Sequence, residues 1–366
     1  MPQLAMLIKP ASSLCNMRCK YCFYADVSDS RQVKSYGVMS ADTARAVIDR
    51  GLEFVGPRGR LHMAFQGGEP TVAGLSFFET FTAYAASRKP DGVELAYSIQ
   101  TNGLVIDKAW AALFKKHGFL VGLSFDGTPE LHDFLRPDAA GRGTARRVLE
   151  TANLLDRAGV DLNILTVVTR QAAKHPAKIY QFYKKSGFSF VQFIPCLPPF
   201  EEEKGQSHAL TPRLYAAFLK ELFHLWESDL IRGTYVSIRL FDNLARLAAG
   251  RRPEQCGMLG FCQPQFVVEA DGGVYPCDFY VLDQYRMGCL LETGFRELES
   301  SPALAEFLKP AEKGTLCAEC PCLSFCGGGC KRYRPFYFME EGYCPYRDFL
   351  LECWPGFRRI AAGLRL

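Results

Sequence analysis

Three cysteines lie close together near the start of the chain. Cys15, Cys19 and Cys22 occur in the segment SSLCNMRCKYCFYA, directly after an apolar stretch. Four thiolates close a tetrahedral metal site, and closed sites are structural. A loop that carries only three thiols lacks the fourth ligand. The spacing therefore indicates a metal centre that leaves one coordination position for a second molecule.

A cubane iron–sulfur cluster fits three thiolates held in one loop. When three cysteines bind such a cluster, one iron keeps a free coordination position. The aromatic residues Tyr21, Phe23 and Tyr24 flank the last cysteine and would shield a cluster from water. A zinc or disulfide loop is the alternative interpretation of the same cysteines.

The other cysteines are concentrated in the second half of the chain. Of 15 cysteines in 366 residues, Cys196 stands alone and eleven lie between Cys256 and Cys353, whereas all six histidines precede residue 225. A secreted chain would use cysteines for disulfides, but a chain of this length builds a large core of its own. We therefore expect metal held by sulfur, either in iron–sulfur clusters or in two four-cysteine zinc knuckles.

Composition disfavours several classes of partner. The formal net charge is +4, from 43 basic and 39 acidic residues, and no basic tract is present that could follow a phosphate backbone. No apolar run approaches the roughly 18 to 20 residues that cross a bilayer. The N-terminal residues do not resemble a signal peptide. We expect a cytoplasmic protein that binds neither nucleic acid nor membrane.

Short apolar segments alternate with amphipathic ones up to about residue 240. Strands are predicted over 4–9, 61–66, 94–100, 119–125, 162–168 and 190–195, and helices over 40–54, 75–88, 107–117, 142–158, 172–186 and 212–228. Strands that are apolar on both faces and alternate with helices are typical of parallel βα units. Six such units indicate an α/β fold, either a partial (β/α)6 barrel like a TIM barrel or an open doubly wound sheet.

Polar and glycine-rich segments follow the first four predicted strands. They are the cysteine loop, GGEP (67–70), TNG (101–103) and SFDG (124–127). Working residues of parallel α/β folds lie at the carboxyl ends of strands, so these segments are expected to form one site.

A different composition begins near residue 256. Residues 266–280 predict a hairpin around Asp-Gly-Gly, and the thiol-dense segment 317–333 cannot form a packed core by itself. The chain is therefore expected to have a domain over 1–240 and a small metal-stapled domain over 241–366.

The cysteine loop and Gly67-Gly68-Glu69-Pro70 resemble the signatures of the radical S-adenosylmethionine enzymes. The resemblance implies that the open iron binds the amino and carboxylate groups of S-adenosylmethionine. An electron from the cluster would then cleave this molecule and generate a 5′-deoxyadenosyl radical. The resemblance also implies that S-adenosylmethionine is contacted by Tyr21, Gly68, Ser124, Arg136 and Leu197.

The later cysteines resemble the SPASM extension, which carries two auxiliary clusters. By this resemblance the first cluster would be held by Cys256, Cys262, Cys277 and Cys330, and the second by Cys317, Cys320, Cys326 and Cys344. Three cysteines remain without a role: Cys289, Cys322 and Cys353. Cys322 is close enough in sequence to Cys320 and Cys326 to compete as a ligand.

Several stretches, including LIKPASSLCNMRCKYCFY, FQGGEPTVAGLSFF and YPCDFYVLD, are similar to the anaerobic sulfatase-maturating enzymes. That family oxidises a cysteine or serine in a Cys/Ser-x-Pro-x-Arg motif of an unfolded sulfatase polypeptide to Cα-formylglycine. The resemblance assigns Asp278 the role of the base, and Tyr24 and Gln66 are expected to hold the peptide. A hairpin-capping aspartate is the alternative for Asp278.

The resemblance also implies three [4Fe–4S] clusters, or about twelve irons, and an electron donor such as a flavodoxin or ferredoxin. Two other functions remain open. One is a SPASM peptide maturase that forms thioether cross-links; many of these carry a leader-binding domain, which is not expected before a cluster loop that starts at residue 15. The other is an electron-transfer protein without catalysis.

Overall fold

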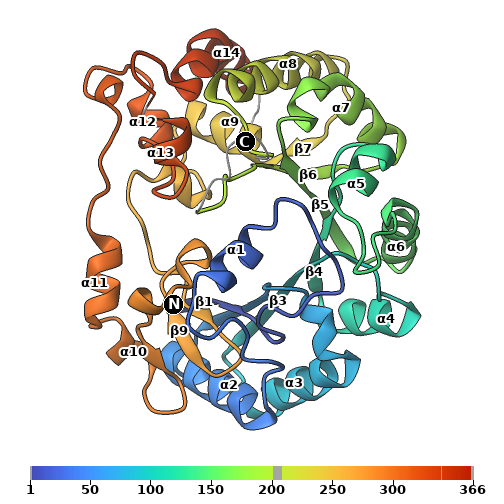
Figure 1. Cartoon of the computed structure of the whole chain (residues 1–366), viewed down its shortest axis with the longest axis vertical. Coiled ribbons are helices and arrows are strands. Elements are labelled where there is room, and N and C mark those ends of the chain that lie inside the picture. Colours follow the sequence, from blue (N-terminus) through green and yellow to red (C-terminus); the bar gives the residue numbers. More distant parts are fainter. Residues whose placement is uncertain (1, 201–207, 339, 364–366) are drawn as a thin grey trace. The chain divides into compact units, whose positions relative to one another are not determined.

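The computed structural model describes residues 2–200, 208–338 and 340–363 (Figure 1). Its strands are β1 (Gln3–Ile8), β2 (Arg60–Phe65), β3 (Glu94–Thr101), β4 (Phe119–Ser124), β5 (Asp161–Val168), β6 (Phe190–Pro195), β7 (Ser237–Ile238), β8 (Val267–Val268), β9 (Gly273–Tyr275) and β10 (Gly288–Cys289). Its α-helices are α1 (Phe23–Asp29), α2 (Ala41–Val55), α3 (Leu75–Arg88), α4 (Lys108–His117), α5 (Pro129–Leu135), α6 (Ala145–Arg157), α7 (Pro176–Lys185), α8 (Pro212–Ile231), α9 (Arg239–Ala248), α10 (Phe295–Leu298), α11 (Pro302–Leu308), α12 (Leu323–Cys326), α13 (Arg334–Tyr337) and α14 (Pro345–Gly363). Short 3-10 turns are η1 (Pro70–Ala73), η2 (Ala172–Lys174), η3 (Cys256–Met258), η4 (Asp278–Tyr280), η5 (Asp283–Tyr285) and η6 (Thr315–Cys317).

Two compact units interleave along the chain. The first contains Met1–Ser124, Arg136–Leu162 and Pro264–Lys309; the second contains Phe125–Leu135, Asn163–Gln263 and Pro310–Leu366. These units do not coincide with the predicted ranges 1–240 and 241–366, because residues 264–309 join the sheet of the first unit. The division into two successive domains stays a prediction.

The first unit is built on strands in the order β10-β9-β8-β1-β2-β3-β4. Strands β1 to β4 are parallel, and the short strand β8 also runs parallel to β1. Strands β8 and β9 form the predicted hairpin, while the pairing of β8 with β1 was not predicted. Helices α2 and α3 lie on one side of the strands and α1 lies on the other (Figure 1). The carboxyl ends of the parallel strands are therefore brought to one edge.

Apolar side chains explain why this unit packs. In β1 the alternate residues Leu4, Met6 and Ile8 are buried, and the ring of Phe65 in β2 lies 4.9 Å from that of Phe78 in α3. Burying one such side chain stabilises the fold by about 1.5–3 kcal/mol. Helix α2 begins one residue after the predicted start at residue 40, and the Ser40 hydroxyl caps it by accepting the Thr43 N–H at 3.0 Å.

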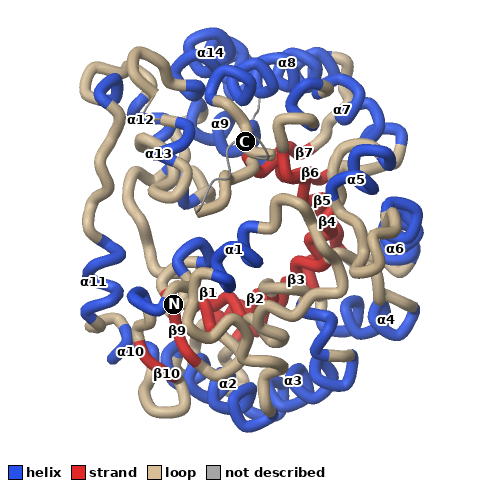
Figure 2. The backbone as a smooth tube through the Cα atoms, in the orientation of Figure 1, coloured by secondary structure: helices blue, strands red, loops and turns tan. Residues whose placement is uncertain are grey.

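The second unit contains β5 from Asn163 onward, β6 and β7, which are parallel and adjacent in this order. Helix α14 packs against α8 and α9, and the ring of Phe223 lies 4.5 Å from Phe357 and 5.7 Å from Phe241. Figure 2 shows the cysteine-rich residues 309–338 as loop with short helices. Within the described ranges, no helix combines the length and apolarity needed to span a membrane.

Candidate active site

The three-cysteine loop connects β1 to α1 in the first unit. Cys22 is the residue that precedes α1 and is exposed, whereas Cys15 and Cys19 are half-buried. The Cys22 N–H donates to the Cys19 carbonyl at 3.3 Å, which folds the loop back on itself. Burial raises the pKa of the Cys15 thiol to about 11, and the nearby Glu69 and Cys22 add to the effect. A thiolate at this position therefore needs a cationic group beside it, which a metal cluster would supply.

The Gly-Gly segment lies directly against the cysteine loop, as predicted. The Gly68 N–H donates to the Ser12 carbonyl and the Glu69 N–H donates to the Leu14 carbonyl, both at 2.8 Å. A Cβ atom at Gly68 would lie 2.2 Å from the Leu14 oxygen. Only glycine allows this close approach of the two backbones.

The carboxylate of Glu69 ties the segment to the end of β3. It is 2% exposed, and its Oε1 accepts hydrogen bonds from the hydroxyls of Thr71 and Thr101 at 2.6 and 2.7 Å. Its Oε2 accepts the Asn102 N–H at 2.7 Å. Burial raises the pKa of Glu69, and these hydrogen bonds oppose the rise. The Asn102 amide in turn donates to Asn16 Oδ1 at 2.7 Å, so three strand-end loops meet.

The residues predicted to contact S-adenosylmethionine divide between the two units. In the first unit, the Arg136 guanidinium lies 4.0 Å from Cys19 Sγ and its central carbon 5.4 Å from the Tyr21 ring. Gly68 adjoins the same loop, and Ser124 ends β4. Leu197 is buried in the second unit. All five contacts stay predictions.

Asp278 lies at the start of η4, directly after Cys277. Lys9 Nζ forms an ion pair with Asp278 Oδ1 at 2.5 Å, and Gln66 Nε2 donates to Oδ2 at 2.7 Å. The Asp278 carboxylate therefore accepts hydrogen bonds from Lys9 and Gln66, the residues that directly follow the neighbouring strands β1 and β2. An aspartate that only caps the hairpin would bind the backbone of the hairpin instead. Its role as the base stays a prediction.

Tyr24 is buried in the same unit and is only 2% exposed. Its hydroxyl donates to Glu269, and Lys9 Nζ lies 3.7 Å from the centre of its ring. Sequence reasoning predicted a peptide contact for Tyr24 and missed Lys9, Glu269 and Arg31. A signal was present for the first two, because each is a charged residue directly after an apolar strand.

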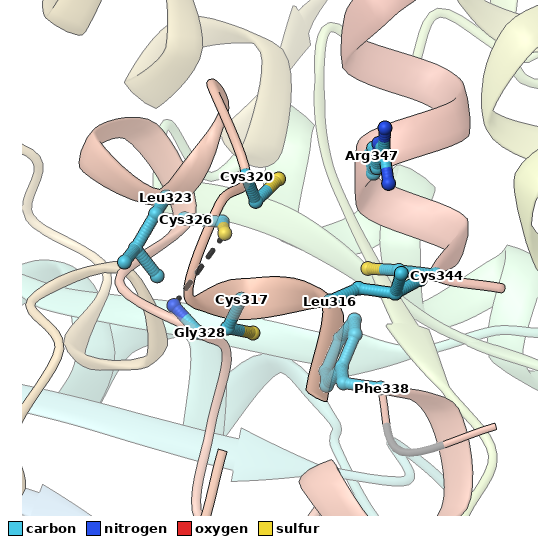
Figure 3. A pocket seen from close by; sticks show the side chains of 9 residues that line it. All are labelled: Leu316, Cys317, Cys320, Leu323, Cys326, Gly328, Phe338, Cys344 and Arg347. Carbon is cyan, nitrogen blue, oxygen red and sulfur yellow. Dashed lines mark hydrogen bonds between the residues drawn. The ribbon is translucent and has the colours of Figure 1, made fainter. Parts of the chain in front are cut away.

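Four cysteines line a single cavity in the second unit. Figure 3 shows the side chains of Cys317, Cys320, Cys326 and Cys344 around it. The Gly328 N–H donates to Cys326 Sγ at 3.4 Å, and the φ angle of Gly328 is +84°, which favours glycine. Cys322 does not line this cavity. The predicted ligands of the second auxiliary cluster are thus collected in one place.

Three of the four predicted ligands of the first auxiliary cluster also belong to the second unit. Burial raises the pKa of Cys256, and the neighbouring thiols of Cys330 and Cys262 raise it further, which places the three together. Cys277 follows β9 in the first unit, so the complete set of four stays a prediction. All fifteen cysteines lie in the described ranges, and none of them forms a disulfide.

Comparison with known proteins identifies the family. Residues 10–183 match the model of the radical SAM superfamily, and residues 261–321 match that of an iron–sulfur cluster-binding domain. A cysteine-type anaerobic sulfatase-maturating enzyme of Clostridium perfringens is 44% identical over 100% of both chains. The chain belongs to the anaerobic sulfatase-maturating enzymes.

Two further proteins are similar to this anaerobic sulfatase-maturating enzyme over most of its length. A serine-type enzyme of Klebsiella aerogenes is 31% identical over 89% of this chain and 79% of its own length. The solved structure of native anSMEcpe with bound AdoMet and the Kp18Cys peptide has a TM-score of 0.91 and 40% identity, and covers 99% of this chain and 100% of that one.

Family membership confirms the predicted fold and cofactors. The protein is a radical S-adenosylmethionine enzyme with an α/β partial barrel and a SPASM domain, and it uses one [4Fe–4S] cluster that binds S-adenosylmethionine together with auxiliary clusters. The residues fit these groups. The first loop offers three thiols beside a close glycine backbone, and the cavity in the second unit offers four.

Proposed function

We propose that this enzyme oxidises a cysteine in an unfolded sulfatase polypeptide, within a Cys-x-Pro-x-Arg motif, to Cα-formylglycine. The observation that carries the proposal is the end-to-end similarity to cysteine-type enzymes, at 43–45% identity. Serine-type enzymes are 28–31% identical, so oxidation of serine in the same motif is the second candidate.

The chain's own residues have distinct tasks in this proposal. Cys15, Cys19 and Cys22 would hold the first cluster; Tyr21, Gly68, Ser124, Arg136 and Leu197 would hold S-adenosylmethionine. When bound, these two groups supply the one-electron chemistry that removes a hydrogen atom from the cysteine Cβ. Asp278 takes the proton of the thiol, since a carboxylate within hydrogen-bond reach can act as a general base.

The proposed oxidation converts the cysteine side chain to an aldehyde in two stages. The cysteine side chain loses one hydrogen atom from carbon to the 5′-deoxyadenosyl radical, one proton from sulfur to Asp278, and one electron that a bound iron–sulfur cluster would accept. This leaves a thioaldehyde. Water then replaces sulfur, and the products are the aldehyde and hydrogen sulfide. Gln66 donates to Asp278 and is half-buried, so we propose that it contacts both the base and the peptide.

The electron donor in this proposal is a small redox protein such as a flavodoxin or ferredoxin. We also propose that the enzyme works in the cytoplasm. The support is that eleven of its fifteen cysteines are assigned to clusters, which require thiols that stay reduced.

The decisive experiment is anaerobic incubation of the enzyme with S-adenosylmethionine, a reductant and a Cys-x-Pro-x-Arg peptide. Mass spectrometry should show the peptide in which an aldehyde replaces the CH2–SH group. A peptide with alanine at the cysteine position should stay unchanged. A peptide that instead loses only hydrogen and becomes internally cross-linked would point to a thioether-forming maturase and overturn the proposal.

A further inference from the structure

Three polar side chains belong to the residues that directly follow three neighbouring strands of the first unit. Strands β8, β1 and β2 are adjacent and parallel, and each is followed at once by a polar residue: Glu269, Lys9 and Gln66. The Lys9 N–H donates to the Val268 carbonyl at 2.8 Å, and the Gln66 N–H donates to the Ile8 carbonyl at 3.0 Å. The sheet therefore places these residues side by side.

Lys9 is the central member of this row. It is 0% exposed, and a buried ammonium group requires an ionic partner. That partner is Asp278, at 2.5 Å. The Tyr24 ring lies 3.7 Å from Lys9 Nζ and covers it from another side, a cation–π contact. The ammonium is thus confined between a carboxylate and an aromatic face.

A second buried ion pair holds the Tyr24 ring in place. The Tyr24 hydroxyl donates to Glu269, and Arg31 donates to the same Glu269 oxygen at 2.6 Å. The side chains of Arg31 and Glu269 are both 0% exposed. The Ala270 N–H donates to the other oxygen of Glu269 at 3.1 Å, which fixes the carboxylate to its own backbone.

We propose that Lys9 is a positioning residue for the oxidation, which holds the Asp278 carboxylate toward the substrate thiol, and that Tyr24, Glu269 and Arg31 hold Lys9. Tyr24 in this arrangement acts on the base and not on the peptide. The inference rests on the proposed function of Asp278. A displacement of about 1 Å in a reacting group can cost about 100-fold in rate, so an anchor of this kind matters to catalysis.

The first test compares Lys9→Met with wild type, both anaerobically loaded with clusters. We expect the amount of aldehyde formed per S-adenosylmethionine cleaved to fall about 100-fold. The dissociation constant for the peptide should stay near the wild-type value. A weaker affinity for the peptide with an unchanged ratio of aldehyde to cleaved S-adenosylmethionine would overturn the proposal. If wild type itself makes no aldehyde, the proposed function fails instead.

The matched control is Lys34→Met. Lys34 forms an exposed ion pair with Asp29 at 2.9 Å, with side chains 68% and 67% exposed. Removing this charge should change neither the ratio nor the affinity. The double variant Lys9→Met/Asp278→Asn removes both members of the buried pair, and it should be no slower than Asp278→Asn alone. If instead the loss of aldehyde formation in the double variant equals the product of the losses in the two single variants, Lys9 acts independently of Asp278 and the proposal is overturned.

Lys9→Met leaves a buried carboxylate without its partner, so the variant can fail to fold. Tyr24→Phe keeps the ring under Lys9 and deletes only the hydroxyl that binds Glu269. We expect a smaller fall in the ratio and an unchanged affinity for the peptide. A loss of peptide affinity alone in Tyr24→Phe would assign Tyr24 to the peptide and overturn its positioning role.

Discussion

At the scale of single residues, the first site depends on one thiol, that of Cys15, whose surroundings disfavour its charged form. Burial raises the pKa of Cys15, and Glu69 and Cys22 raise it further, so the loop without a cluster holds a neutral thiol there. A bound cluster removes that proton. Loop formation and cluster binding are therefore coupled at Cys15.

Replacing Cys15 by alanine should abolish cleavage of S-adenosylmethionine. We also expect the iron content to fall from about twelve to about eight atoms per chain, because only the first cluster is lost. Iron analysis and detection of 5′-deoxyadenosine check both results. Cys353→Ala is the control, since Cys353 is buried but has no predicted ligand role, and it should keep all the iron. Retained iron in Cys15→Ala would show that the loop does not hold a cluster.

Glu69 is a second residue whose role can be measured. Glu69→Ala leaves the donors on Thr71, Thr101 and Asn102 buried without an acceptor. Each unsatisfied buried group costs about 1–3 kcal/mol, so the free energy of unfolding should fall by several kcal/mol. Denaturant titration measures the loss. Glu69→Gln keeps an acceptor oxygen and should lose less; equal losses in the two variants would contradict this account.

At the scale of elements, most of the parallel strands were predicted from the sequence. Each of the six predicted strands differs from β1 to β6 by at most one residue at either end. The pairing of β8 with β1 was not predictable, because β8 is two residues long and its partner lies more than 250 residues earlier. The sequence marks Lys9 and Glu269 only as charged residues directly after apolar strands, and their proximity was missed for the same reason. Their meeting depends on that pairing, and local periodicity carries no information about it. Helix α14 was not predicted, because Pro355 interrupts its apolar stripe, which Phe349 and Phe357 form.

Helices α7 and α8 are joined by an ion pair that makes stability depend on pH. Lys184 of α7 binds Asp229 of α8, whose side chain is 8% exposed. Burial alone would raise the pKa of Asp229, but the hydrogen bond and the positive charge of Lys184 outweigh it and lower the pKa below its ordinary value of 3.8. An acid with a lowered pKa in the folded state stabilises the fold above its ordinary pKa and loses this contribution as pH falls through the lowered value.

Asp229→Asn should therefore reduce the free energy of unfolding at pH 7 by about 1–3 kcal/mol. The difference between variant and wild type should shrink below pH 3.8, where Asp229 becomes protonated in the unfolded chain and then in the folded one. Denaturation curves measured from pH 7 to pH 3 test this. A difference that is independent of pH would show that the ion pair contributes nothing.

At the scale of the whole molecule, the first unit draws on three separate parts of the chain. Residues 264–309 supply β8, β9 and β10 to its sheet and bring Asp278 to Lys9. The second unit likewise uses residues 310–366, whose helix α14 covers α8 and α9. Neither unit is complete in a fragment that ends near residue 240.

We expect a chain cut after residue 240 to fold poorly. It would leave the edge of β1 uncovered and Lys9 buried without its carboxylate. The expected result is the absence of a cooperative thermal transition, measured by circular dichroism, with the full chain as the control. A sharp transition in the fragment would support 1–240 as an autonomous domain.

The partnership of the first strand with a late one also bears on synthesis at the ribosome. Lys9 and Asp278 are 269 positions apart, so the first strand leaves the exit tunnel long before its neighbour has been translated. Until then, Lys9 in the nascent chain has no Asp278 carboxylate as counter-ion, and the edge of β1 that pairs with β8 has no partner. Contacts so distant along the chain form slowly, and for this interval the nascent polypeptide would benefit from chaperone protection.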